Sequence, residues 1–105
     1  MTALSDGTVA IPLSELLTNV RPREMNTHLQ RAGIEPKAAE TSINAFLVHT
    51  GSRLVLVDAG GGKLFPNSGR LLASLAAAGY RRDQVTDVLV SHLHHAGSQP
   101  CCALR

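Results

Sequence analysis

Three histidines stand close together near the end of the sequence, His92, His94 and His95, in the segment Ser-His-Leu-His-His-Ala-Gly. Neutral imidazole is a common protein ligand of zinc, copper, iron and nickel. His92 and His94 alternate along the chain, so in an extended segment both side chains point to one face and both rings reach one cation. The spacing alone leaves open both a metal site and a surface group of histidines without a metal.

The segments before and between these residues predict a strand–helix–strand unit. Val88–Val90 is an apolar strand that leads directly into the histidines, and Leu54–Val57 is a second apolar strand, expected to be buried on both faces. Leu71, Leu72 and Leu75 mark a helix between them, closed by a glycine. Sites in layered α/β proteins gather at the carboxyl ends of such strands.

The remaining elements are predicted from turn and cap residues. Asp6-Gly7 is a two-residue turn signal and predicts a first hairpin over Thr2–Ile11, and Gly51-Ser52 predicts a second hairpin over Ser42–Val57. Pro22 suits the first position of a surface helix that stops at Gly33. Asn67 or Ser68 is the expected cap of the helix at Leu71.

Composition narrows the class of protein. The chain has 105 residues, 44% hydrophobic and 17% charged, with a net charge of +2, which suits one small globular domain. Its basic residues are scattered rather than gathered in a stripe, so nucleic-acid binding is not expected. Neither an 18-residue apolar run nor a signal peptide is seen, so no membrane span is expected. The compartment stays open: the chain as written suits the cytoplasm, and a periplasmic or secreted location is the alternative for an intact relative.

The order of these motifs resembles the metallo-β-lactamase superfamily. Residues 41–97 contain an apolar strand ending in Asp-Ala-Gly-Gly, an Ala/Leu helix, and an apolar strand ending in Ser-His-Leu-His. Residues 2–20, 40–65 and 71–94 resemble the branch that holds methyl parathion hydrolase and related lactonase-like enzymes. The resemblance implies an α/β layered fold, here the N-terminal half of an αββα sandwich: two hairpins followed by a βαβ unit.

The resemblance also implies the site. The family carries two zinc ions, His92 and His94 would ligate the first, and Asp58 would support a ligand through a hydrogen bond. The family's aspartate after the second histidine is missing here. One alignment then puts His95 in the place of the motif's last histidine, and another leaves that place to Gly97. Either way no catalytic residue is identified, and at most one zinc is expected.

These departures predict that residues 1–97 are a partial metallo-β-lactamase-like domain and that 98–105 is a tail outside the family, left by a frameshift or premature stop.

The favoured function is a zinc hydrolase of small esters, lactones or phosphotriesters that is inactive as this chain. The alternative is a non-enzymatic remnant that binds one metal weakly through His92, His94 and His95. A thiol pair at Cys101-Cys102 is a third, weaker hypothesis.

Without the second sheet of a sandwich, one face of the first sheet should stay uncovered. Ile43, Leu47, Leu54 and Leu56 are predicted to lie on that face. A large exposed apolar patch promotes association between molecules. We therefore expect a homo-oligomer or an aggregate formed through the exposed sheet face.

Overall fold

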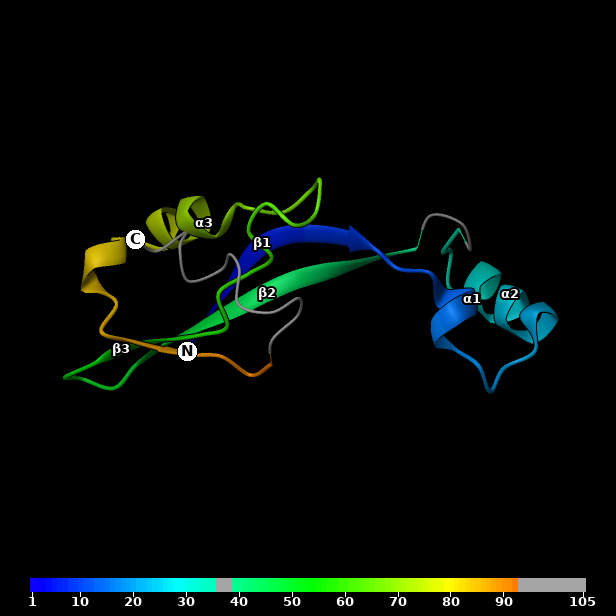
Figure 1. Cartoon of the computed structure of the whole chain (residues 1–105), viewed down its shortest axis with the longest axis horizontal. Coiled ribbons are helices and arrows are strands. Elements are labelled where there is room, and N and C mark those ends of the chain that lie inside the picture. The colour runs from blue at the N-terminus through cyan, green and yellow to red at the C-terminus, as the bar shows by residue number, and fades with distance from the viewer. Residues whose placement is uncertain (36–38, 93–105) are drawn as a thin grey trace. The chain divides into compact units, whose positions relative to one another are not determined.

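The computed structural model describes residues 1–35 and 39–92 (Figure 1). By contacts the chain divides into two units, Ala10–Thr41 and the rest of the chain. The elements in chain order are β1 (Thr2–Ala10), α1 (Leu13–Leu16), α2 (Pro22–Arg31), β2 (Glu40–His49), β3 (Leu54–Val57), α3 (Leu71–Ala77), the 3-10 turn η1 (Arg82–Gln84) and β4 (Asp87–Leu89).

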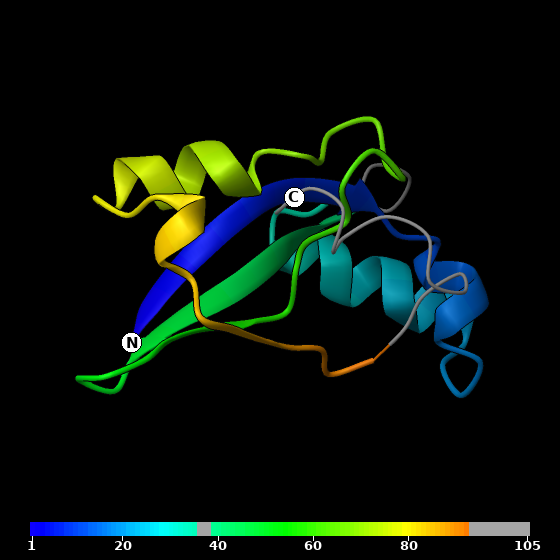
Figure 2. The same cartoon turned by 60° about the vertical axis from the view of Figure 1, so that its left-hand side comes forward.

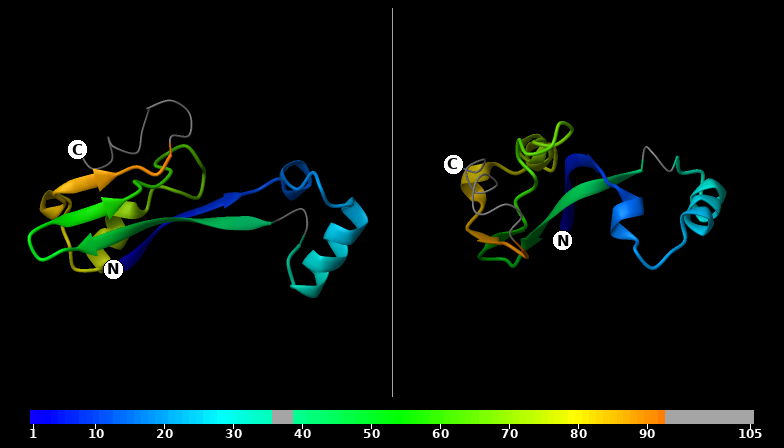
Figure 3. Two further views of the ribbon diagram at one scale, coloured as in Figure 1. Left: turned by 90° about the horizontal axis from the view of Figure 1, so that it is seen from below. Right: turned by 45° about the vertical axis from the view of Figure 1, so that its right-hand side comes forward.

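The strands form a four-stranded sheet in the order β1-β2-β3-β4 (Figure 3, left). β2 and β3 are antiparallel and joined by the predicted turn, where the Thr50 amide donates to the Arg53 carbonyl at 2.9 Å. β3 and β4 are parallel neighbours and α3 lies between them in sequence. The second hairpin and the βαβ unit are therefore confirmed, and with them the mixed α/β fold class.

The predicted first hairpin is wrong, because β1 runs without a turn from Thr2 to Ala10, through Asp6 and Gly7. Gly7 forms no turn and instead allows the backbone of β1 to lie very close to a neighbouring loop. A Cβ atom at Gly7 would stand 1.8 Å from the backbone oxygen of Asn67. The next residue, Thr8, donates its amide to that same oxygen at 3.1 Å. The Asp-Gly pair thus lets β1 pass against the loop that precedes α3.

Helix α3 covers one face of the sheet (Figures 1 and 2). The core beneath it is one cluster of buried aliphatic side chains: Leu4, Ala45, Leu47, Leu54, Leu56, Leu71 and Leu75. The prediction that Leu47, Leu54 and Leu56 form an uncovered face is therefore wrong, since all three are buried by the helix. Alternation along a strand cannot by itself say which of its two faces a helix will cover.

The face of the sheet turned away from α3 is also apolar. Strand alternation and register place five apolar side chains on it, together with the charged Asp87 opposite Val55. We call the five the open sheet face: Phe46, Val48, Val55, Val57 and Leu89. Leu89 is 58% exposed and Phe46 36% exposed. Leu54–Val57 was expected to be buried on both faces, but Val55 and Val57 are only half-buried.

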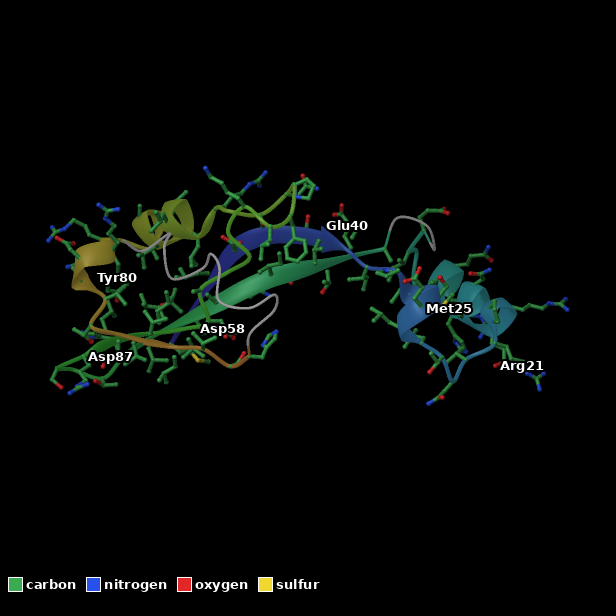
Figure 4. The ribbon with its side chains drawn as sticks, viewed as in Figure 1. Arg21, Met25, Glu40, Asp58, Tyr80 and Asp87 are labelled. Atoms are coloured by element: carbon green, nitrogen blue, oxygen red, sulfur yellow. The ribbon has the colours of Figure 1, made fainter. Side chains whose placement is uncertain are left out.

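The unit Ala10–Thr41 holds α1 and α2. Pro22 is the first residue of α2, Gly33 follows its end with a φ of 71°, and Met25 (labelled in Figure 4) is its one buried residue. The predicted surface helix with a proline start and a glycine stop is confirmed. Among the helices of residues 1–35 and 39–92, none is long and apolar enough to span a bilayer.

The cap of α3 differs from the prediction. Neither Asn67 nor Ser68 caps it, and the N-cap residue Arg70 makes no capping bond through its side chain. The Ser68 hydroxyl donates to the Gly62 carbonyl at 2.7 Å instead. The first amide of the helix, that of Leu71, donates to the Asp6 carboxylate at 2.9 Å. A residue 65 positions away supplies the cap, which no local sequence pattern reveals.

Replacing Gly7 by alanine should destabilise the unit built on the sheet by about 3 kcal/mol, the upper end of overpacking costs, because the new methyl group meets a backbone oxygen. Gly51→Ala is the matched control: its φ is also positive, at 93°, but no atom lies within 4 Å of the added Cβ. The control should cost only about 1–2 kcal/mol, for the left-handed conformation. Urea unfolding measures both, and equal losses would contradict the close approach at Gly7.

Candidate metal-binding site

Asp58 turns the chain out of β3. Its φ is 63°, the only left-handed conformation of a non-glycine residue in the described part of the chain. Asp tolerates this region better than most residues because its short polar side chain bonds locally. The Asp58 amide donates to the Leu89 carbonyl of β4 at 2.7 Å. Asp58 (labelled in Figure 4) is therefore held where β3 and β4 both end.

Both oxygens of the Asp58 carboxylate accept hydrogen bonds from Ser91. Oδ1 accepts from the Ser91 amide at 2.8 Å and Oδ2 accepts from the Ser91 hydroxyl at 2.9 Å. The two residues are 33 positions apart, and the parallel pairing of β3 with β4 brings them together. Both oxygens of Asp58 are therefore bonded to the residue that directly precedes His92.

The Ser91 hydroxyl also lies 2.8 Å from Nδ1 of His92. An ionised carboxylate only accepts, so the single Ser91 hydroxyl proton goes to Asp58. The serine oxygen then accepts from His92, which places a proton on Nδ1 of the imidazole. The three side chains form a chain of hydrogen bonds, Asp58–Ser91–His92, in which Nδ1 of the imidazole donates to the serine oxygen.

The loop after Asp58 is held by Asp6 of β1. The carboxylate of Asp6 accepts from the amides of Gly61 at 2.8 Å, Gly69 at 3.1 Å and Leu71 at 2.9 Å. A Cβ atom at Gly60 would lie 2.6 Å from the Asp6 carboxyl carbon, so only glycine fits there. The sequence reading missed Asp6 and Ser91, since it assigned the first to a turn and treated the second as part of a motif without a role.

The other predicted ligands, His94 and His95, lie outside the described residues, and so do Cys101 and Cys102. Within residues 1–35 and 39–92, no group of three or more His, Cys, Asp or Glu side chains gathers to hold a metal ion. The described part contributes one oriented imidazole and one supporting carboxylate. This donor set fits a zinc ligand with its support, and a complete ligand sphere needs further residues.

Comparisons with known proteins identify the family of the chain. The family described as the Metallo-beta-lactamase superfamily matches residues 38–95. This range runs from just before β2 to the histidines and includes Asp58, Ser91 and His92. Among curated proteins there is no significant match.

Two solved structures illustrate the structural similarity. The hydrolase AbOPH in the beta lactamase superfamily is 35% identical with a TM-score of 0.79, and 88% of this chain covers 32% of that one. AidC, a dizinc quorum-quenching lactonase in complex with the product N-hexnoyl-L-homoserine, is 31% identical with a TM-score of 0.81, over the same shares of the two chains. The chain thus spans about a third of the length of both structures.

Ser91→Ala should release His92 from its single tautomer, because the hydroxyl that accepts from Nδ1 is gone. The loss of the bond to Asp58 should also lower the free energy of unfolding by about 1 kcal/mol. Nitrogen chemical shifts of the His92 ring measure the tautomer. Ser91→Thr keeps the hydroxyl and is the control; if it and Ser91→Ala give the same ring shifts, the hydroxyl does not set the tautomer.

Proposed function

Because the chain belongs to the metallo-beta-lactamase superfamily, we propose that it carries part of the metal site of a zinc-dependent hydrolase. His92 and His94 are the proposed zinc ligands, and His95 is a third candidate. The Asp58–Ser91–His92 chain of hydrogen bonds carries this proposal. A histidine that ligates a metal usually donates its other ring nitrogen's proton to a supporting group, which fixes the ring and its tautomer.

Each described residue has a defined part in this proposal. His92 would bind through Nε2, because its Nδ1 proton is given to Ser91. Asp58 would hold Ser91 by two hydrogen bonds and so keep the imidazole in place. A bound zinc ion lowers the pKa of a coordinated water to about 7 and thereby supplies a nucleophile at neutral pH. At most one zinc is proposed, because the sequence lacks the aspartate that follows the second histidine of the family motif and would hold a second zinc.

The proposed substrate is a small molecule with an ester-like bond. Similarity to AidC, a lactonase in complex with its product, favours a lactone. Other esters and phosphotriesters stay candidates because of the resemblance seen in the sequence. Both similarities extend over 88% of this chain but only 32% of theirs. The proposed substrate is therefore that of a whole hydrolase of this family, of which this chain matches about a third. That the 105 residues alone are inactive stays a prediction.

A second candidate function is metal binding without catalysis. It is favoured by the sequence, which lacks the aspartate expected after the second histidine of the motif. In this case His92, His94 and His95 would bind one ion weakly. The two candidates differ in turnover: hydrolysis of a lactone by the zinc-loaded chain favours the first, and zinc binding without hydrolysis favours the second.

The proposed zinc site predicts one zinc per chain after purification under native conditions. Elemental analysis measures the zinc, beside the double variant His92→Ala, His94→Ala, which should retain none because both proposed ligands are lost. His28→Ala on the exposed surface of α2 is the matched control and should keep the zinc. Equal zinc in the parent and the double variant would contradict the site, as would loss of zinc in the control.

We also propose self-association, through the open sheet face in place of the face first predicted. That face is apolar, and its exposed Leu89 lies beside Val57 in the register. Sedimentation velocity over a range of concentrations should show the parent associating and Leu89→Lys remaining monomeric. Leu72→Lys on α3, where the leucine is 37% exposed, is the control and should associate like the parent. A monomeric parent at high concentration would contradict the proposal.

A further inference from the structure

Asp6 is a buried carboxylate with no part in the proposed zinc site. It is 1% exposed and is the one buried polar or charged residue in the described part of the chain. A buried carboxylate is costly unless its oxygens accept hydrogen bonds. Asp6 meets this need with three backbone amides, so its place in the fold depends on the segment that supplies them.

All three amides belong to the connection between β3 and α3. Gly61 stands near the start of this loop, Gly69 near its end, and Leu71 is the first residue of the helix. The Arg70 amide adds a bond to the Asp6 backbone oxygen at 3.0 Å. One side chain of β1 therefore gathers both ends of the loop that begins at Asp58.

The Asp6 carboxylate both accepts a hydrogen bond from the start of the loop and packs tightly against its backbone. Gly60 has a φ of 74°, and its missing Cβ would overlap the Asp6 carboxyl group at 2.6 Å. The backbone from Asp58 to Gly61 is thus held at two points. Its first residue bonds to Leu89 and Ser91, and its last bonds to Asp6.

We propose that Asp6 is a positioning residue for the zinc site: it fixes Gly60 and Gly61 so that Asp58 holds Ser91, and through it the Nδ1-protonated form of His92. The inference rests on the proposed function and deepens it. Asp6 acts through Asp58, and its carboxylate accepts from backbone amides of the loop and of α3. Both oxygens of Asp6 are needed as acceptors: Oδ2 accepts from the Gly61 and Gly69 amides, and Oδ1 accepts from the Leu71 amide. A substitution that removes one acceptor should therefore disturb the loop.

Asp6→Asn tests this with almost no change of shape. An amide side chain has one acceptor oxygen and one NH₂ group, so its NH₂ group would stand opposite a backbone amide that also donates. Asp6→Ser keeps a single acceptor oxygen without the opposing NH₂ group, and gives the same comparison if the asparagine variant does not fold. Leu75→Val is the matched control, because it loosens the buried contacts of α3 and leaves every partner of Asp6 in place.

Two readouts are taken on the whole chain, well below the melting temperature of every variant. Zinc affinity is measured by competition with a chelator, and the ring nitrogens of His92 are measured by NMR without metal. Asp6→Asn should weaken zinc binding about 10–100-fold, the usual cost of losing a supporting partner, and should replace the single His92 tautomer by a mixture. Leu75→Val should keep the parent's values in both.

The outcomes separate this inference from the proposed function. A parent chain that binds no zinc would defeat the proposed function, and the ring spectra would then decide alone on Asp6. The inference is overturned if Asp6→Asn keeps the parent's ring spectrum, if Leu75→Val changes as much as Asp6→Asn, or if the parent itself lacks the Nδ1-protonated form.

Discussion

The burial of one carboxylate group sets the arrangement of the sheet unit. Asp6 lies under the loop between β3 and α3 and is stable there only because three amides of that connection donate to it. The same bonds cap α3 and draw β1 against the loop. The carboxyl group requires glycine at position 60, and the close passage of β1 beside Asn67 requires glycine at position 7. Edge strand, loop and helix are thus joined by a single side chain, and the core under α3 forms beside it.

The second constraint is the parallel pairing of β3 with β4. It sets the carboxyl ends of the two strands side by side, so that Asp58 of one reaches Ser91 after the other. Parallel neighbours need a crossover, and α3 provides it while covering one face of the sheet. The packing of the core and the geometry of the candidate site therefore have a common cause.

The two faces of the sheet differ in how far they are buried. Helix α3 buries the side chains of one face, whereas the open sheet face remains apolar and partly exposed. The similar structures are about three times as long as this chain, which matches 32% of each. An apolar face of this kind favours contact with a further layer or with another molecule, because its exposure to water is unfavourable.

The sequence by itself determined what depends on neighbouring residues: the hairpin at Gly51-Ser52, the glycine ends of α2 and α3, the apolar runs of β3 and β4, and the motif that indicates the family. Tertiary structure alone decided which face of the sheet α3 covers, that Asp6 caps α3 instead of making a turn, and that Ser91 links Asp58 to His92. The first depends on the packing of the α3 leucines against the strands, and the other two on hydrogen bonds between residues 33 to 65 positions apart. An Asp-Gly pair looks the same in a hairpin turn as beside a passing loop, and only the partner in space tells the two apart.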